Sequence, residues 1–244
     1  MLNKIYIKIL LMVISLIDIK NKKKIVIFFK KKLNEKLLNI IDVGAHKGET
    51  ISLFYKNFTI NKILAFEPNP IVFKKLENKI KKTNYKNKII LFNLGLGSKE
   101  EEKDLLINND TSSSTYNAID ENTEYYKRKK IFLSMFNKDI LRKKILTKIL
   151  PLSKVNEVNH IENIDILKID TEGYELNILK GINENHFNKI KYIYFEHHYN
   201  LMIKKNYKYS DIKIFLNKNN FYLAFKIKMK FRKTFEYIYE NRNK

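Results

Sequence analysis

Three short segments combine residue types that could do chemistry, and each directly follows an apolar run typical of a buried strand. They are residues 42–49 (DVGAHKGE), 67–69 (EPN) and 170–175 (DTEGYE). In an open parallel sheet, ligands bind beyond the carboxyl ends of the strands. We therefore expect the three segments to meet at one edge of a sheet and to form a site rich in carboxylates.

The first two segments indicate a nucleotide-like cofactor. Gly44 and Gly48 permit a tight turn from strand to helix and let a ligand approach the backbone. Glu67 follows Gly44 by 23 residues, about the spacing at which a carboxylate binds ribose hydroxyls. Asp42 would repel a pyrophosphate, and the dinucleotide fingerprint has a third glycine. S-adenosylmethionine, which carries an ammonium and a sulfonium group, fits better, with a nicotinamide dinucleotide as the alternative.

The third segment holds two candidate catalytic residues, Asp170 and Glu172. Side chains alternate along an extended chain, so both would lie on the same side of the strand end. Two histidines, His197 and His198, follow the next predicted strand, and at most one of them would face the site. Because histidine titrates near neutral pH, His197 or Asp170 is the candidate base, and Glu172 would orient the acceptor hydroxyl.

Alternating strand and helix patterns surround these segments and predict an α/β fold with a doubly wound, mostly parallel sheet. Predicted strands cover residues 37–43, 62–66, 88–94, 105–108, 164–169 and 191–195; predicted helices cover 49–58, 70–82, 174–179 and 211–218, the last with Ser210 as N-cap; 221–228 and 233–239 should pair as an antiparallel hairpin. Residues 124–150 carry apolar residues near helical spacing and predict a helix with a solvated cationic face. Residues 109–117 are polar and serine-rich, which is typical of a lid.

Four motifs within residues 37–200, IIDVGAHKGETISLF, AFEPNP, FNLGLGS and LKIDTEGYELNILKG, resemble those of the FkbM family of S-adenosylmethionine-dependent methyltransferases. The resemblance implies a class I methyltransferase (Rossmann-like) fold with a seven-stranded sheet whose last strand is antiparallel. It also implies O-methylation, often of a sugar hydroxyl in a glycan or of a polyketide-type product. By this resemblance the methionine part would contact residues 42–48, the ribose Glu67 and the adenine the region of Asn93 and Leu94, while Asp170, Glu172 and Gly173 would face the sulfonium and the acceptor.

The sequence departs from the family pattern at two places. His46 stands where the family more often has asparagine, which keeps the capacity for hydrogen bonding and adds a titratable group near the methyl. Ser153 follows Leu152 where the family usually has aspartate. The second departure removes an acid that would belong to the acceptor site.

Composition limits the partners. The chain has 244 residues, which is enough for one large α/β domain. Its net charge is +22. It has no cysteine, and its histidines lack a second ligand pair at metal-binding spacing, so we expect no metal. Only four of its 48 basic residues are arginine, the side chain best suited to reading bases and phosphates. A nucleic-acid partner is therefore not expected, although an RNA methyltransferase that uses the lysine-rich surface is the alternative.

The N-terminus carries an apolar run of nine residues at 9–17 (ILLMVISLI), followed by a basic stretch. The run is too short to span a bilayer, and no small-residue cleavage site follows it, so secretion is not expected. We expect residues 1–36 to form a basic and apolar helical extension of the methyltransferase domain at 37–244. The extension either packs on the domain or lies in the plane of an anionic membrane through residues 1–32. The expected location is the cytoplasm, either free or at the inner face of the membrane.

Overall fold

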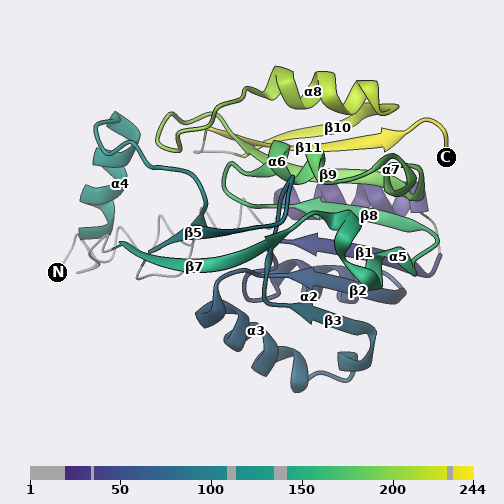
Figure 1. Ribbon diagram of the computed structural model, residues 1–244. Helices are drawn as coiled ribbons and strands as arrows, with labels where there is room; N and C mark the ends of the chain where they lie inside the picture. The colour runs from purple at the N-terminus through teal and green to yellow at the C-terminus, as the bar shows by residue number, and fades with distance from the viewer. Residues whose placement is uncertain (1–19, 34–35, 109–113, 135–141, 230–232) are drawn as a thin grey trace.

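The structure is a computed structural model, and it describes residues 20–33, 36–108, 114–134, 142–229 and 233–244. The apolar run at 9–17 and the first part of the predicted lid, residues 109–113, lie outside the described residues. Figure 1 shows the arrangement of the helices and strands.

Seven strands form the central sheet, in the order β10-β11-β9-β8-β1-β2-β3. They are β1 (Leu38–Val43), β2 (Ile60–Phe66), β3 (Ile89–Phe92), β8 (Ile164–Ile169), β9 (Ile190–His198), β10 (Phe221–Met229) and β11 (Thr234–Asn241). The pairs β1–β2, β1–β8, β2–β3 and β8–β9 are parallel, whereas β11 runs antiparallel to β9 and β10. The predicted mostly parallel sheet with an antiparallel hairpin at its C-terminal end is confirmed.

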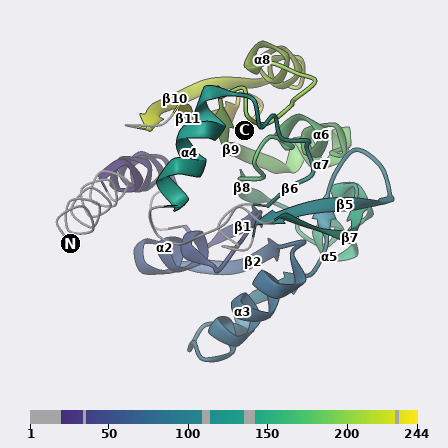
Figure 2. The ribbon, with the colours of Figure 1, turned by 90° about the vertical axis from the view of Figure 1, so that its left-hand side faces the viewer.

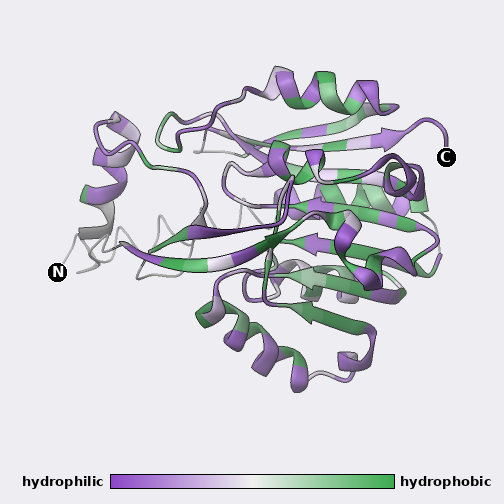
Figure 3. Cartoon of the chain, viewed as in Figure 1, coloured by the Kyte–Doolittle hydropathy of each residue, from purple (hydrophilic) through white to green (hydrophobic). Residues whose placement is uncertain are grey.

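Helices cover both faces of this sheet, as expected for a doubly wound fold (Figure 2). One face carries the helix through residues 20–33, α2 (Glu49–Asn57) and α3 (Pro70–Lys81), which bury Phe29, Phe54 and Leu76 against the strands. The other carries α6 (Glu175–Lys180), α7 (Glu184–Lys189) and α8 (Tyr209–Lys218), which bury Leu179, Phe187 and Leu216. Figure 3 shows the resulting concentration of hydrophobic residues on the central strands.

Two helix starts illustrate how local sequence sets the boundaries. Helix α3 begins at Pro70, and the Asn69 side chain accepts hydrogen bonds from the amides of Ile71 and Val72, as predicted for proline in a first turn. The expected N-cap of α8, Ser210, is wrong. The helix begins at Tyr209, two residues before its predicted start, so its N-cap is Lys208. The Asp211 carboxylate, inside the first turn, accepts a hydrogen bond from the amide of Lys208 at 2.7 Å. This bond stabilises the helix start in place of the expected Ser210 hydroxyl.

A second sheet of four strands, in the order β4-β7-β5-β6, was not predicted. Its strands are β4 (Gly95–Leu96), β5 (Glu101–Asn108), β6 (Ser114–Thr115) and β7 (Arg142–Leu150); short helical segments elsewhere are η1 (Lys86–Lys88), η2 (Leu152–Lys154) and α5 (Asn156–Asn159). The prediction of a helix over 124–150 is wrong beyond α4 (Glu124–Ser134), because β7 pairs antiparallel with the whole of β5. Ile145 and Ile149 are four residues apart, a spacing that also places both on one side of a strand.

The helix through residues 20–33 is packed on the sheet. Ile25, Phe29 and Leu33 are buried in the core, and the Phe29 ring lies 5.7 Å from that of Tyr192. Its apolar face is therefore occupied by the protein's own sheet. The domain boundary at residue 36 and the membrane contact through residues 1–32 stay predictions. Within the part of the chain that the structure describes, no helix is both long and apolar enough to cross a membrane.

Candidate active site

A cavity of about 410 Å³ opens at the carboxyl ends of the central strands, a volume within the ~300–1,000 Å³ common for small-molecule sites. Six of its lining residues are acids, namely Glu49, Glu67, Asp170, Glu172, Glu196 and Glu236, and two are lysines, Lys22 and Lys168. The charge of the lining is thus opposite to that of the chain, which carries a net +22. Such a cavity favours a cationic ligand over a diphosphate.

The turn after β1 is built on close backbone contact. Gly44 has a φ of +81°, and a Cβ placed on it would lie 1.9 Å from the carbonyl oxygen of Asp170. The amides of Gly44 and Ala45 both donate to the carbonyl of Phe66 at 2.9 Å. Only glycine fits here, and Gly48, at the N-cap of α2, completes the turn with a φ of +75°. The turn therefore lies tightly between β2 and β8 and leaves its outer side to the cavity.

Glu67 connects the first two loops. Its Oε2 accepts from the amide of His46 at 2.8 Å, and its Oε1 accepts from the amide of Asn69 at 2.9 Å. Burial raises the pKa of Glu67, although both amide hydrogen bonds oppose that shift. Each carboxylate oxygen has a further lone pair, and Glu67 lines the cavity. The side chain can therefore hold the loops and still accept hydrogen bonds from ligand hydroxyls.

Lys168 bridges two of the predicted site residues. It stands opposite Asp42 in the β1–β8 register, and its Nζ lies 3.2 Å from Asp42 Oδ1 and 3.4 Å from Asp170 Oδ2. Burial raises the pKa of Asp42 against the opposing charge of Lys168. Burial also acts to lower the pKa of Lys168, but the two carboxylates outweigh it and raise the value. Asp42 lies beneath the cavity floor, while Asp170 and Lys168 line the cavity.

Sequence reasoning gave Lys168 no role, since an isolated lysine within a strand has no distinctive spacing. The available signal was its place between Asp165 and Asp170 on a buried strand, because a lysine buried there requires acidic partners. The acid on β1 that pairs with Lys168 is set by the register of β1 and β8. The sequence alone does not give that register.

Glu172 lies at the rim of the cavity beside a histidine. Its backbone has a φ of +51°, a conformation uncommon for residues with a Cβ. His198 Nε2 lies 3.2 Å from Glu172 Oε2 and 3.3 Å from Glu196 Oε1, and its Nδ1 lies 3.2 Å from the Thr234 hydroxyl. Of the two adjacent histidines on β9, His198 is therefore the one that contacts the acids Glu172 and Glu196 of the cavity lining.

His197 lies elsewhere. It is buried, is not part of the cavity lining, and its Nδ1 lies 3.9 Å from Glu175 Oε2. Burial lowers its pKa. Burial acts to raise the pKa of Glu175, but the nearby His197 and the hydrogen bonds from the Tyr207 hydroxyl and the amide of Gly173 outweigh it and lower the value. Glu175 and His197 thus position the loop after β8, and His197 is not placed to take a proton from a molecule in the cavity.

Asn93 and Leu94, the residues expected at an adenine, lie next to the cavity lining. The side-chain amide of Asn93 donates to the carbonyl of Glu67 at 2.8 Å and to that of Pro68 at 3.2 Å. Leu94 packs against the core. The preceding Phe92 stacks on Phe66 with ring centroids 4.6 Å apart. The Asn93 side chain therefore supports the Glu67 loop, and the contact of Asn93 and Leu94 with an adenine stays a prediction.

The described end of the predicted lid is tied to the loop after β8. The Thr115 hydroxyl donates to the carbonyl of Glu172 at 2.8 Å, and the Asn117 amide donates to that of Gly173 at 2.6 Å. Ser114 and Tyr116 line the cavity. The second sheet thus forms one wall of the site, a contribution that sequence reasoning missed because the strand pairing of β5 and β6 was not foreseen.

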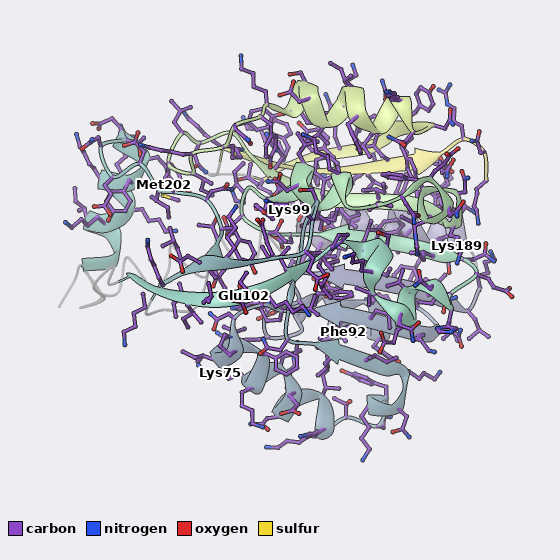
Figure 4. All side chains as sticks on the ribbon, viewed as in Figure 1. Lys75, Phe92, Lys99, Glu102, Lys189 and Met202 are labelled. Atoms are coloured by element: carbon purple, nitrogen blue, oxygen red, sulfur yellow. The ribbon has the colours of Figure 1, made fainter. Side chains whose placement is uncertain are left out.

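Among the described residues, no group of three or more His, Cys, Asp or Glu side chains could hold a metal ion. The labelled lysines Lys75, Lys99 and Lys189 lie far apart on different parts of the ribbon (Figure 4).

Comparisons with known proteins agree with this architecture. A family model described as Methyltransferase FkbM domain matches residues 42–223. Methyltransferase sdnD from Sordaria araneosa is 28% identical over 171 residues, which cover 64% of this chain and 65% of that protein. The chain thus spans slightly less than two thirds of the length of this curated relative.

Two solved structures show the same fold. Methyltransferase FkbM from Methylobacillus flagellatus KT matches with a TM-score of 0.53 and 15% identity, over 83% of this chain and 44% of that chain. The magnesium protoporphyrin IX methyltransferase of Synechocystis PCC 6803, with bound SAH, matches with a TM-score of 0.51 and 10% identity, over 93% of this chain and 84% of that chain. The family model extends over most of the chain and includes the end of β1, the whole of β2 and β8, and the loops that follow these three strands. The chain belongs to the FkbM methyltransferase family and has the class I methyltransferase fold.

Proposed function

We propose that the protein is an S-adenosylmethionine-dependent O-methyltransferase that methylates a hydroxyl group of a sugar, a glycan or a related natural product. The observation that carries the proposal is the cavity lined by six acids at the carboxyl edge of the sheet. Family membership supports the reaction type. The lining supports an uncharged acceptor, because an anionic one would be repelled by these carboxylates.

The residues present fit the cofactor. The Gly44 turn, which leaves no room for a Cβ on the side of Asp170, would receive the methionine part together with His46. Glu67, with an unused lone pair on each oxygen, would bind the ribose. Asp170 would lie nearest the sulfonium. When bound, the cofactor supplies an activated methyl group, so the protein needs chiefly to position the acceptor and exclude water, effects that contribute ~7–11 kcal/mol to barrier lowering.

The proposed catalytic residues are Asp170 and Glu172. Both line the cavity, and Asp170 is held by Lys168, while Glu172 is held beside His198. In this arrangement Glu172 orients the acceptor hydroxyl and Asp170 faces the positive end of the donor. His197 is left out of the set because it does not reach the cavity.

Thermal unfolding with S-adenosylmethionine, S-adenosylhomocysteine and NAD, measured in parallel, tests the cofactor. At about 100 times Kd, a ligand that binds only the folded state stabilises it by ~2.7 kcal/mol. For a chain of this size, that corresponds to a rise in Tm of roughly 5–11 °C. We expect the rise with the first two ligands and none with NAD. A rise with NAD alone would contradict the proposal.

The Glu67→Gln variant tests the ribose contact. Glutamine keeps one acceptor oxygen but replaces the other with a donor, so one of the two amide contacts and a ribose contact are lost. A charge-assisted hydrogen bond contributes ~1.5–3 kcal/mol, so calorimetry should show S-adenosylhomocysteine binding weakened by roughly 10–100-fold. The matched control is Glu77→Gln, on the exposed side of α3, where Glu77 pairs with Lys74 and Lys81 and the affinity should not change.

A further inference from the structure

Glu236 lies at the end of the cavity opposite Glu67. The cavity extends along the sheet from β2, which ends beside Glu67, across β1, β8 and β9 to β11, which carries Glu236. Four steps between neighbouring strands at ~4.8 Å each separate the two ends by about 19 Å. The proposed cofactor contacts lie at β1, β2 and β8. Glu236 therefore belongs to the part of the cavity that is left for the acceptor.

The Glu236 carboxyl group is buried and only partly satisfied. The residue is 5% exposed, and its Oε2 has no hydrogen-bond partner in the structure. Tyr194 and Glu196 line the same cavity, and Glu196 stands opposite Glu236 in the β9–β11 register. Glu236 also lines the cavity. A buried acceptor oxygen left without a partner in a lining residue has a cost in desolvation, which a hydrogen bond from a ligand would offset.

Charged groups from three elements surround it. Asp170 follows β8 and repels the Glu236 carboxylate, whereas Lys168 on β8 and Lys22 on the helix through residues 20–33 attract it. Burial is the largest influence and raises the pKa of Glu236 to about 7. A carboxyl group with that proton affinity is a stronger base than an ordinary carboxylate and still ionises at neutral pH.

We propose that Glu236 is the catalytic base for the acceptor, with Tyr194 and Glu196 completing the acceptor subsite. This inference rests on the proposed methyl transfer. The acceptor O–H bond breaks and its proton goes to Glu236 Oε2. The acceptor oxygen forms the new bond to the methyl carbon, and the carbon–sulfur bond breaks with its electron pair going to sulfur, which becomes neutral. The substrate class is an uncharged hydroxyl compound.

The experiment measures proton release on cofactor binding and needs no acceptor. A base that faces the methyl group senses the sulfonium charge of S-adenosylmethionine but finds no such charge on S-adenosylhomocysteine. Calorimetric titration at pH 7 in two buffers of different protonation enthalpy gives the number of protons released. Because Glu236 is about half protonated at that pH, S-adenosylmethionine should release roughly 0.5 proton more than S-adenosylhomocysteine.

Three variants decide the source of that proton. Glu236→Gln should abolish the difference, and Glu236→Asp should retain a titrating group and hence a measurable release. The control Glu77→Gln, outside the cavity lining, should retain the full difference. If the two ligands release equal numbers of protons from the wild-type protein, or if Glu236→Gln releases as many as wild type, Glu236 does not face the methyl group. Binding of both ligands with no difference overturns this inference and leaves the proposed function intact, whereas absence of binding overturns both.

Discussion

The Gly44→Ala variant is expected to bind S-adenosylhomocysteine roughly 100-fold more weakly than wild type, from about 1–3 kcal/mol of overpacking plus the strain of a positive φ. The added Cβ would lie 1.9 Å from the carbonyl oxygen of Asp170. The atom that the Cβ would meet belongs to the backbone, so no side chain can move aside to relieve the clash. The turn after β1 must separate from the end of β8, which distorts both halves of the cofactor site. Isothermal calorimetry measures the affinity.

Gly181→Ala is the matched control, because a Cβ there would also lie 1.9 Å from a backbone carbonyl, that of Gly97. Gly181 lies at the end of α6 and is not part of the cavity lining. Both variants should lower the free energy of unfolding, but in the folded protein Gly181→Ala should bind the ligand with nearly wild-type affinity. Equal losses of affinity would mean that general destabilisation, and not the Gly44 turn, controls binding.

The Lys168→Met variant is expected to lose about 3–5 kcal/mol of stability, because it leaves a buried carboxylate, Asp42, without its opposite charge. Asp42 is 1% exposed and pairs with Lys168 at 3.2 Å. The same substitution at Lys36, whose side chain is 62% exposed and lies 3.9 Å from Asp165, should cost at most about 1 kcal/mol. Urea unfolding at pH 7 measures both.

The pH dependence identifies the cause of the loss. Burial already raises the pKa of Asp42 above its usual 3.8, and removal of Lys168 raises it further. When the pKa of a carboxyl group is higher in the folded state than in the unfolded state, the free energy of unfolding falls as pH rises from the lower pKa through the higher one. The deficit of Lys168→Met should therefore be smaller at pH 5 than at pH 8. The double variant Asp42→Asn/Lys168→Met should recover most of the stability; a deficit independent of pH and of Asp42 would assign the loss to packing.

Much of the central sheet could be predicted from the sequence. Buried strands such as β1 and β8 are short segments rich in Ile and Leu, and the helices between them have strong local signals, such as Pro70 after Asn69. The second sheet could not be predicted. In β7 the residues at 145 and 149 fit a helix as well as a strand, and only pairing with β5, about 40 residues earlier in the chain, decides between them.

The candidate site was also predictable only in part. Residues in the loops after β1, β2 and β8 were predicted because each loop is a compact motif, and the structure brings Gly44, Glu67 and Asp170 to one cavity. Glu236 and Lys168 were missed because their role depends on strand register, which joins distant segments. The choice of His197 over His198 failed for a related reason, since alternation shows that the two side chains diverge but not which one faces the cavity.

A crystal structure of the protein grown with S-adenosylmethionine or S-adenosylhomocysteine tests the central claim most directly. We expect the ligand in the acid-lined cavity, with its ribose hydroxyls at Glu67, its methionine part against the Gly44 turn and its sulfur toward Asp170. A cavity without the ligand at saturating concentration, or a dinucleotide in its place with the diphosphate at the Gly44 turn, would contradict the account.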